Sequence, residues 1–173
     1  MARTEEKLPI IAIIGRQNVG KSSLLNAIAG RRLSIVDPMP GVTRDRVTAI
    51  VAKRGVPFQL VDTAGMGMAR EDQFFESVER QIQYAIEEAD LVLFVVDAIA
   101  GLLEADKQVA TRLRRAGKDV LLVANKSDNT SIENGLMPFA ELGFGDAVPV
   151  SCAHMRRLGE LLDILLEKLP QVA

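Results

Sequence analysis

The chain has 173 residues, which is enough for one domain with a packed core and too few for two domains of ordinary size. Its 48% hydrophobic and 25% charged residues exclude a disordered or fibrous protein. A net charge of −2 argues against a broad nucleic-acid-binding surface, while a single cysteine excludes an internal disulfide and favours the cytoplasm.

No segment predicts a membrane span or a signal peptide, because the best apolar run, at residues 91–96, has only the length of a strand. We predict a flexible N-terminal lead-in at residues 1–8, one folded domain at 9–170 and a short C-terminal tail at 171–173. A basic patch formed by Arg112, Arg114 and Arg115 reads as a solvated helix face.

Apolar runs and helical stripes alternate along the domain. Near-continuous apolar runs predict buried strands at residues 10–14, 58–61, 91–96 and 120–124, with a further strand at 147–150. Apolar residues at helical spacing predict helices at 23–29, around 78–86 and 102–113, at 136–142, and from Leu158 to Leu169, where Pro170 ends the last helix.

Residues 46–53 and 56–62 flank Arg54-Gly55 and predict a hairpin, which adds one antiparallel strand. The predicted fold class is therefore α/β, with a mostly parallel six-stranded sheet, one antiparallel strand and helices on both faces. Two segments, 31–45 and 64–72, keep neither period and predict functional loops at the carboxyl edge of the sheet, where α/β folds bind ligands.

The clearest motif is Gly15-Arg16-Gln17-Asn18-Val19-Gly20-Lys21-Ser22, which fits the phosphate-loop pattern G-x-x-x-x-G-K-[ST] between a strand and a helix. Its glycines let backbone N–H groups surround phosphates, and the helix N-terminus and Lys21 add positive charge. Ser22 offers a hydroxyl to Mg²⁺, and Ser23 next to it is a further nucleotide-binding candidate. The loop predicts nucleotide phosphates but leaves the base and the reaction open.

The second motif, Asp62-Thr63-Ala64-Gly65, follows an apolar strand. A strand-terminal aspartate in phosphate-loop enzymes binds Mg²⁺, often through water, and the following glycine can present its N–H to the γ-phosphate. We therefore predict these roles for Asp62 and Gly65.

The third motif, Asn125-Lys126-Ser127-Asp128, also follows a buried strand. The Asp128 carboxylate can accept two hydrogen bonds from guanine, whereas adenine offers no such donor pair. Lys126 can lay its stem along the base, and Asn125 can tie this loop to the phosphate loop. The motif predicts a preference for guanine nucleotides.

These motifs, in this order, resemble those of the translation-factor-like G proteins over nearly the whole chain. Three further stretches resemble the first G domain of the EngA (Der) family, within the TrmE–Era–EngA group: Gly41-Val42-Thr43-Arg44-Asp45, Val123 to Asp128, and Leu142-Gly143-Phe144-Gly145-Asp146. The resemblance implies a P-loop NTPase G domain at 9–170 that binds GTP and GDP and hydrolyses GTP with Mg²⁺.

The resemblance also implies roles for single residues. Thr43 would complete the Mg²⁺ shell from switch I, and Ser151-Cys152-Ala153 would form the base loop in which the Cys152 N–H meets guanine O6. The family has Ala at the place of Cys152, so we expect this cysteine to be incidental. The family's His-Gly-Arg-Gly is here His154-Met155-Arg156-Arg157, a change that predicts a reshaped loop.

Hydrolysis would rest on Lys21, Thr43, Gly65 and Asn18. Ras-like proteins orient the attacking water with a glutamine, but that position holds Met66. Asn18 matches the asparagine that coordinates K⁺ in potassium-activated members of the group, and a cation there would neutralise developing charge. Its other reading is a residue that only caps the loop. Weaker candidates are Asp37 near the K⁺, and Glu71 and Glu76 for positioning water.

By the same resemblance the partner would be the ribosome or a pre-ribosomal subunit, in maturation of the large subunit. EngA proteins carry a second G domain and a KH-like domain, so the chain is expected to be a fragment or a stand-alone relative. Two other readings stay open, a GTP-dependent binding module with negligible hydrolysis and an ATP-using phosphate-loop enzyme.

Overall fold

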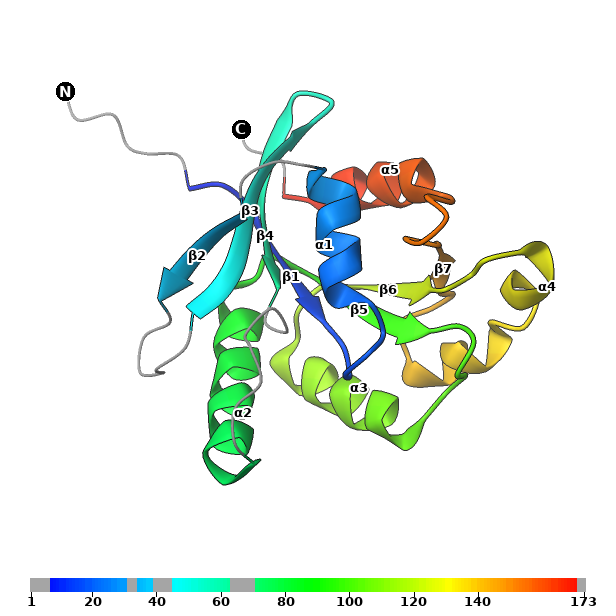
Figure 1. Ribbon diagram of the computed structural model, residues 1–173, viewed down its shortest axis with the longest axis horizontal. Helices are drawn as coiled ribbons and strands as arrows, with labels where there is room; N and C mark the ends of the chain where they lie inside the picture. Colours follow the sequence, from blue (N-terminus) through cyan, green and yellow to red (C-terminus); the bar gives the residue numbers. More distant parts are fainter. Residues whose placement is uncertain (1–6, 31–33, 39–44, 63–70, 171–173) are drawn as a thin grey trace.

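The computed structural model describes residues 7–30, 34–38, 45–62 and 71–170 (Figure 1). The elements, in chain order, are β1 (Ile10–Ile14), α1 (Lys21–Ala29), β2 (Ser34–Pro38), β3 (Asp45–Lys53), β4 (Val56–Asp62), α2 (Glu71–Glu88), β5 (Leu91–Asp97), α3 (Glu104–Ala116), β6 (Val120–Asn125), α4 (Thr130–Glu133), the 3-10 helix η1 (Met137–Leu142), β7 (Val148–Pro149) and α5 (Leu158–Lys168). No helix among the described residues has both the length and the apolar character that a membrane crossing needs.

The strands form a single sheet in the order β2-β3-β4-β1-β5-β6-β7. In the described part of the sheet, β3 is the strand of opposite direction, because it pairs antiparallel with both β2 and β4. β1 pairs in parallel with β4 and β5, and β6 pairs in parallel with β5 and β7. The predicted fold class is therefore confirmed. The hairpin is also confirmed, with Arg54 and Gly55 at φ 52° and 79°, the positive values that a tight hairpin turn requires.

The sheet has one strand more than the sequence predicts. β2 lies within residues 31–45, which the sequence analysis treats as a loop, and it pairs antiparallel with β3 from Ser34↔Ala49 to Pro38↔Asp45. A five-residue run that ends in proline carries little strand signal by itself. It becomes an edge strand because β3 offers it a free row of backbone groups, and a proline is tolerated at an edge.

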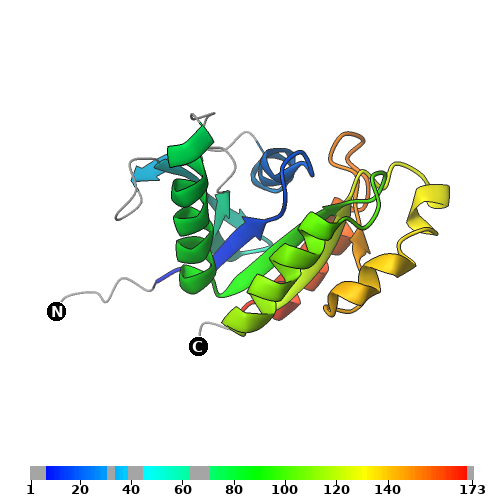
Figure 2. The ribbon, with the colours of Figure 1, turned by 90° about the horizontal axis from the view of Figure 1, so that it is seen from below.

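Helices lie on both faces of the sheet (Figure 2), and one layer of the core packs against each face. Alternate residues of β1 point to opposite faces, so Ile11 and Ile13 pack with apolar residues of α1 and α5, whereas Ala12 and Ile14 pack with those of α2, α3 and η1. All residues of β1 and β5 are buried. This explains why both read as continuous apolar runs.

The remaining elements differ from expectation only in detail. The helix predicted at 136–142 is the 3-10 helix η1, and the strand predicted at 147–150 is reduced to two residues in β7. The four-residue helix α4 has no counterpart in the sequence analysis. Its Asn129 accepts a hydrogen bond from Ile132 N and so caps the helix, but one turn is too short to show a helical period.

Candidate functional site

The phosphate loop connects the end of β1 to the start of α1, and two of its glycines are required by close contacts. A Cβ on Gly15 would lie 2.5 Å from the carbonyl oxygen of Val95, so β5 leaves no room for a side chain there. Gly20 has φ 94°, and a Cβ on it would lie 2.3 Å from Asn125 Nδ2. The loop is thus packed between β5 and the end of β6.

Lys21 lies at the centre of this loop. Its Nζ donates hydrogen bonds to the carbonyl oxygens of Gly15 and Arg16, each at 2.6 Å, and the residue is only 6% exposed. Burial lowers the pKa of Lys21 to about 8, with Asp62 opposing and Arg16 adding to the effect. A buried ammonium that is costly to keep charged gains most from a polyanion beside it, so the loop suits a triphosphate.

Ser22 and Asp62 are brought together from α1 and the end of β4. Ser22 Oγ donates to Asp62 Oδ2 at 2.9 Å, and Asp62 is 1% exposed. The register Ile13↔Asp62 between β1 and β4 sets Asp62 beside the start of the phosphate loop. A hydroxyl and a carboxylate at one point are hard oxygen ligands of the kind that Mg²⁺ prefers, so the residues fit this ion.

Asn125 joins three segments at the end of β6. Its Nδ2 donates to the carbonyl oxygen of Val19 at 2.9 Å, which is the expected tie to the phosphate loop. Its Oδ1 accepts from the backbone N–H of Cys152 at 3.1 Å. The resemblance assigns that N–H to guanine O6, but in the structure it donates to Asn125.

Asp128 is oriented by the loop that follows β7. Ser151 Oγ donates to Asp128 Oδ1 at 2.7 Å, and His154 Nε2 lies 4.0 Å from the same oxygen. The Asp128 side chain is 30% exposed, so a partly accessible carboxylate faces outward at this edge. Cys152 beside it is half-buried, and burial raises the pKa of its thiol to about 11, which supports an incidental role for the sulfur.

Lys126 has two hydrogen-bond partners, neither of which was predicted from the sequence. Its Nζ donates to the carbonyl oxygen of Asn18 at 2.9 Å and to Asp97 Oδ2 at 2.7 Å. Asp97 ends β5, and the register Asp97↔Asn125 sets it directly beside the end of β6. The missed signal was a polar residue at the end of an apolar strand, the same signal that identified Asp62.

The loop before α5 keeps a geometry that glycine favours although it has no glycine. Met155 and Arg157 have φ values of 53° and 57°. Ser151 and Arg156 close the loop with two backbone hydrogen bonds, at 3.2 and 2.9 Å. Two residues with side chains are therefore held in the left-handed region, at the two places where the family pattern has glycine.

The other predicted site residues are distributed as follows. Val19 is buried, Gly20 caps α1, and Asn18, Ser23 and Ala153 are exposed. Thr43, Gly65 and Met66 lie outside the described residues. Asp37 lies in β2, and Glu71 and Glu76 lie in α2, but their side chains are not among those described.

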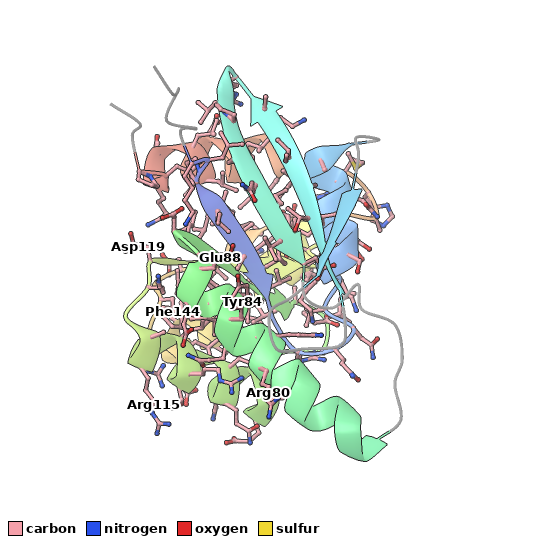
Figure 3. The ribbon with its side chains drawn as sticks, turned by 90° about the vertical axis from the view of Figure 1, so that its left-hand side faces the viewer. Arg80, Tyr84, Glu88, Arg115, Asp119 and Phe144 are labelled. Atoms are coloured by element: carbon pink, nitrogen blue, oxygen red, sulfur yellow. The ribbon has the colours of Figure 1, made fainter. Side chains whose placement is uncertain are left out.

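A cavity of about 820 Å³ lies beside the phosphate loop, between α2 and α3. Figure 3 shows α2 crossing in front of the sheet, with Arg80 and Tyr84 along it and Arg115 on α3. Gly15 and Arg16 line the cavity together with Ile82, Val109 and Arg115. Among the motif residues that the structure describes, only Gly15 and Arg16 line the cavity. The candidate site is therefore the group of loops at the sheet edge.

The chain is similar to known proteins over most of its length. The family model described as "50S ribosome-binding GTPase" matches residues 10–126. GTPase Der from Clostridium novyi (strain NT) is 46% identical over 163 residues, which cover 94% of this chain and 37% of the relative. The chain thus spans little more than a third of the length of this relative.

Solved structures of a GTP-binding protein, Era, are similar to this chain. A variant of Era from Aquifex aeolicus bound to GDP and AlF4⁻ superposes with a TM-score of 0.76 at 30% identity. The match covers 96% of this chain and 58% of the Era chain. Era in complex with MgGDPNP and a segment of 16S ribosomal RNA has a TM-score of 0.74 at 29% identity, with the same coverage. The similarity extends over nearly the whole chain and includes the region of the three motifs.

Proposed function

Since the chain belongs to the family of 50S ribosome-binding GTPases, we propose that it binds GTP and GDP with Mg²⁺ and hydrolyses GTP as a molecular switch. The observation that carries the proposal is the position of Asn125. Its amide bridges Val19 in the phosphate loop and Cys152 in the base loop. This bridge supports the proposal, because a guanine nucleotide requires a phosphate loop and a base-binding loop at the same sheet edge.

Guanine selection is the proposed role of Asp128. The hydrogen bond from Ser151 orients the carboxylate, and its exposed side accepts N1–H and the exocyclic amino group of guanine. The loop of Ser151, Cys152 and Ala153 is proposed to lie near guanine O6. Adenine would leave the oriented carboxylate without donors, which penalises ATP.

Ser22 and Asp62 are the proposed Mg²⁺ residues, joined by Thr43 from switch I. Mg²⁺ would neutralise charge that develops on the phosphates during transfer. In support, Ser22 Oγ at the start of α1 and Asp62 Oδ2 at the end of β4 lie 2.9 Å apart. Era, a structural neighbour, was solved with MgGDPNP.

Hydrolysis asks the protein mainly for positioning and charge stabilisation. Lys21 would hold the β- and γ-phosphates, and the N–H of Gly65 would contact the γ-phosphate. We propose that Asn18 helps to hold K⁺ beside the phosphates, where the cation would add positive charge. This role for Asn18 would compensate for Met66, which cannot orient a water molecule.

The switch itself is proposed to involve residues 31–45 and 64–75, which would order around the γ-phosphate and relax after hydrolysis. For the cell, we propose a cytoplasmic role in biogenesis of the large ribosomal subunit, with the ribosome or a pre-ribosomal subunit as partner. The family description names 50S binding, which supports the large subunit, and the Era neighbour holds 16S ribosomal RNA, which supports contact with ribosomal RNA in general. In a longer protein, a second G domain and a KH-like domain would contribute to this contact.

The test measures phosphate release from GTP in KCl and in NaCl with the purified chain. We expect release that is faster in KCl by about tenfold or more, an advantage that Asn18→Ala removes. Release at equal rates in the two salts would contradict the K⁺ role alone. GTP binding without release in either salt would favour the second candidate, a GTP-dependent binding module, which the presence of Met66 supports.

Nucleotide choice needs a separate experiment. Asp128→Asn should weaken GDP binding by about a hundredfold or more, because an amide offers a donor where guanine also donates. Ser131→Ala, on the exposed helix α4, is the matched control and should bind GDP as the unmodified chain does. Effective competition by ATP in the unmodified chain would contradict the guanine assignment.

A further inference from the structure

Asp97 uses its two carboxylate oxygens for different tasks. Oδ1 accepts hydrogen bonds from the backbone N–H groups of Ile99 and Ala100, both at 2.9 Å, and so holds the turn that follows β5. Oδ2 accepts from Lys126 Nζ at 2.7 Å. The Asp97 side chain is only 8% exposed, so the carboxylate of this ion pair is largely shielded from water.

The ion pair restrains a side chain that is otherwise free to move. Lys126 is 37% exposed, and a lysine of that exposure keeps many rotamers unless something holds its end. Here Nζ is held between Asp97 Oδ2 and the carbonyl oxygen of Asn18. The stem therefore runs from the end of β6 to a point where its ammonium group touches both the end of β5 and the phosphate loop.

Asp97 also lies close to a cation of the phosphate loop. Arg16 Nη2 is 4.0 Å from Asp97 Oδ2, while Arg16 Nε is 3.4 Å from Asp106 Oδ1. Burial pushes the pKa of Asp97 upward, but the hydrogen bonds from Lys126, Ala100 and Ile99 outweigh it and keep the pKa below its usual value. The carboxylate is therefore charged at neutral pH and attracts both cations.

We propose that Asp97 is a positioning residue for guanine nucleotide binding, which acts by holding Lys126 against the phosphate loop before the nucleotide arrives. The inference rests on the proposed function, because it assumes that Lys126 contacts the base. Pre-ordering Lys126 removes the rotamer entropy that binding would otherwise have to offset. Loss of Asp97 should therefore appear as faster nucleotide dissociation.

Asp97→Asn separates the two tasks of the carboxylate. The amide keeps Oδ1 as an acceptor for the turn, but it presents an NH2 group to Lys126 in place of Oδ2. With a fluorescent GDP derivative, we expect Kd to rise about tenfold, mostly through the dissociation rate. Glu141→Gln is the matched control, because it breaks an ion pair outside the motifs, in which Lys107 Nζ lies 3.4 Å from Glu141 Oε1. This variant should change Kd less than about twofold.

A double-mutant cycle with Lys126→Met distinguishes positioning from a purely structural role. If Asp97 acts through Lys126, the Asp97→Asn change should add less than about twofold to the Kd of the Lys126→Met protein. An equal factor in both backgrounds would overturn the inference while leaving the proposed function intact. Failure of the unmodified chain to bind GDP would overturn the proposed function, and the inference with it.

Thermal unfolding of each variant accompanies the cycle. If Asp97→Asn does not fold, the Lys126→Met protein serves as the second test, because it leaves the turn at residues 97–100 intact. Its GDP dissociation must then accelerate by about tenfold or more. A smaller change would overturn the inference, since Asp97 is proposed to act only through this lysine.

Discussion

Gly20 lies so close to Asn125 that a Cβ atom on Gly20 would be 2.3 Å from Asn125 Nδ2. The two residues belong to different motifs and meet where the phosphate loop packs on the end of β6. The contact explains why this position of the loop tolerates no side chain. It also links the stability of the loop to the hydrogen bond between Asn125 and Val19.

Gly20→Ala should therefore abolish nucleotide binding and destabilise the chain by about 3 kcal/mol, since it adds steric overlap to an unfavourable φ. The matched control is Gly117→Ala. Gly117 also lies in the left-handed region, at φ 65°, but has nothing within 4 Å of the added Cβ. The Gly117→Ala change should lower the free energy of unfolding, measured in urea, by only about 1 kcal/mol. Equal losses in the two variants would refute the contact as the cause.

Lys21 should make the free energy of unfolding of the nucleotide-free chain depend on pH. Its native pKa is lowered to about 8, so between that value and the pKa of an unfolded lysine the unfolded state binds more protons. Stability should then rise with pH through this window, by up to about 3 kcal/mol.

The measurement is the urea midpoint between pH 7 and 10, compared with Lys21→Met. The variant has no such group and should lack this part of the rise. Parallel pH profiles for the two proteins would show that Lys21 does not titrate in this range in the folded state.

Met155→Gly should stabilise the chain by about 0.5–1 kcal/mol. A residue with a side chain pays about 1–2 kcal/mol at φ 53°, and a glycine avoids this cost but has more freedom in the unfolded state. Met155 is 63% exposed, so little packing is lost.

Ala153→Gly is the control for Met155→Gly, because Ala153 is exposed in the same loop and is not among the residues with positive φ. The Ala153→Gly variant should be less stable than the unmodified chain by about 0.5–1 kcal/mol. Urea unfolding measures both, and a Met155→Gly protein less stable than the unmodified chain would exclude backbone strain at this position.

Cys152 should react slowly with alkylating agents. With a pKa of about 11, roughly one thiol in a thousand is ionised at pH 8, against about a quarter of free cysteine. Alkylation by iodoacetamide, followed by mass spectrometry, should be slower by about two orders of magnitude than for free cysteine. In urea, where the chain unfolds, the alkylation rate should rise to that of free cysteine. A rate close to that of free cysteine in the folded chain would contradict the effect of burial.

Much of the fold was predictable because its strands are buried on both faces and read as apolar runs. β1 and β4 agree with the predicted ranges 10–14 and 56–62 residue for residue, and β3, β5 and β6 each extend the predicted range by one residue. β2 was not predictable, because its pairing depends on an edge that β3 offers only in the folded chain. The apolar pattern at 136–142 also did not distinguish the 3-10 form of η1 from an α-helix.

The candidate site divides in a similar way. Sequence alone determined the phosphate loop and the roles expected of Lys21, Asp62 and Asp128, because each role needs a particular residue type at a fixed spacing within one short segment. Only the tertiary structure decided which distant groups meet. It paired Asp97 with Lys126 and gave the Cys152 N–H to Asn125, because strand register sets these contacts across tens of residues and leaves no local pattern.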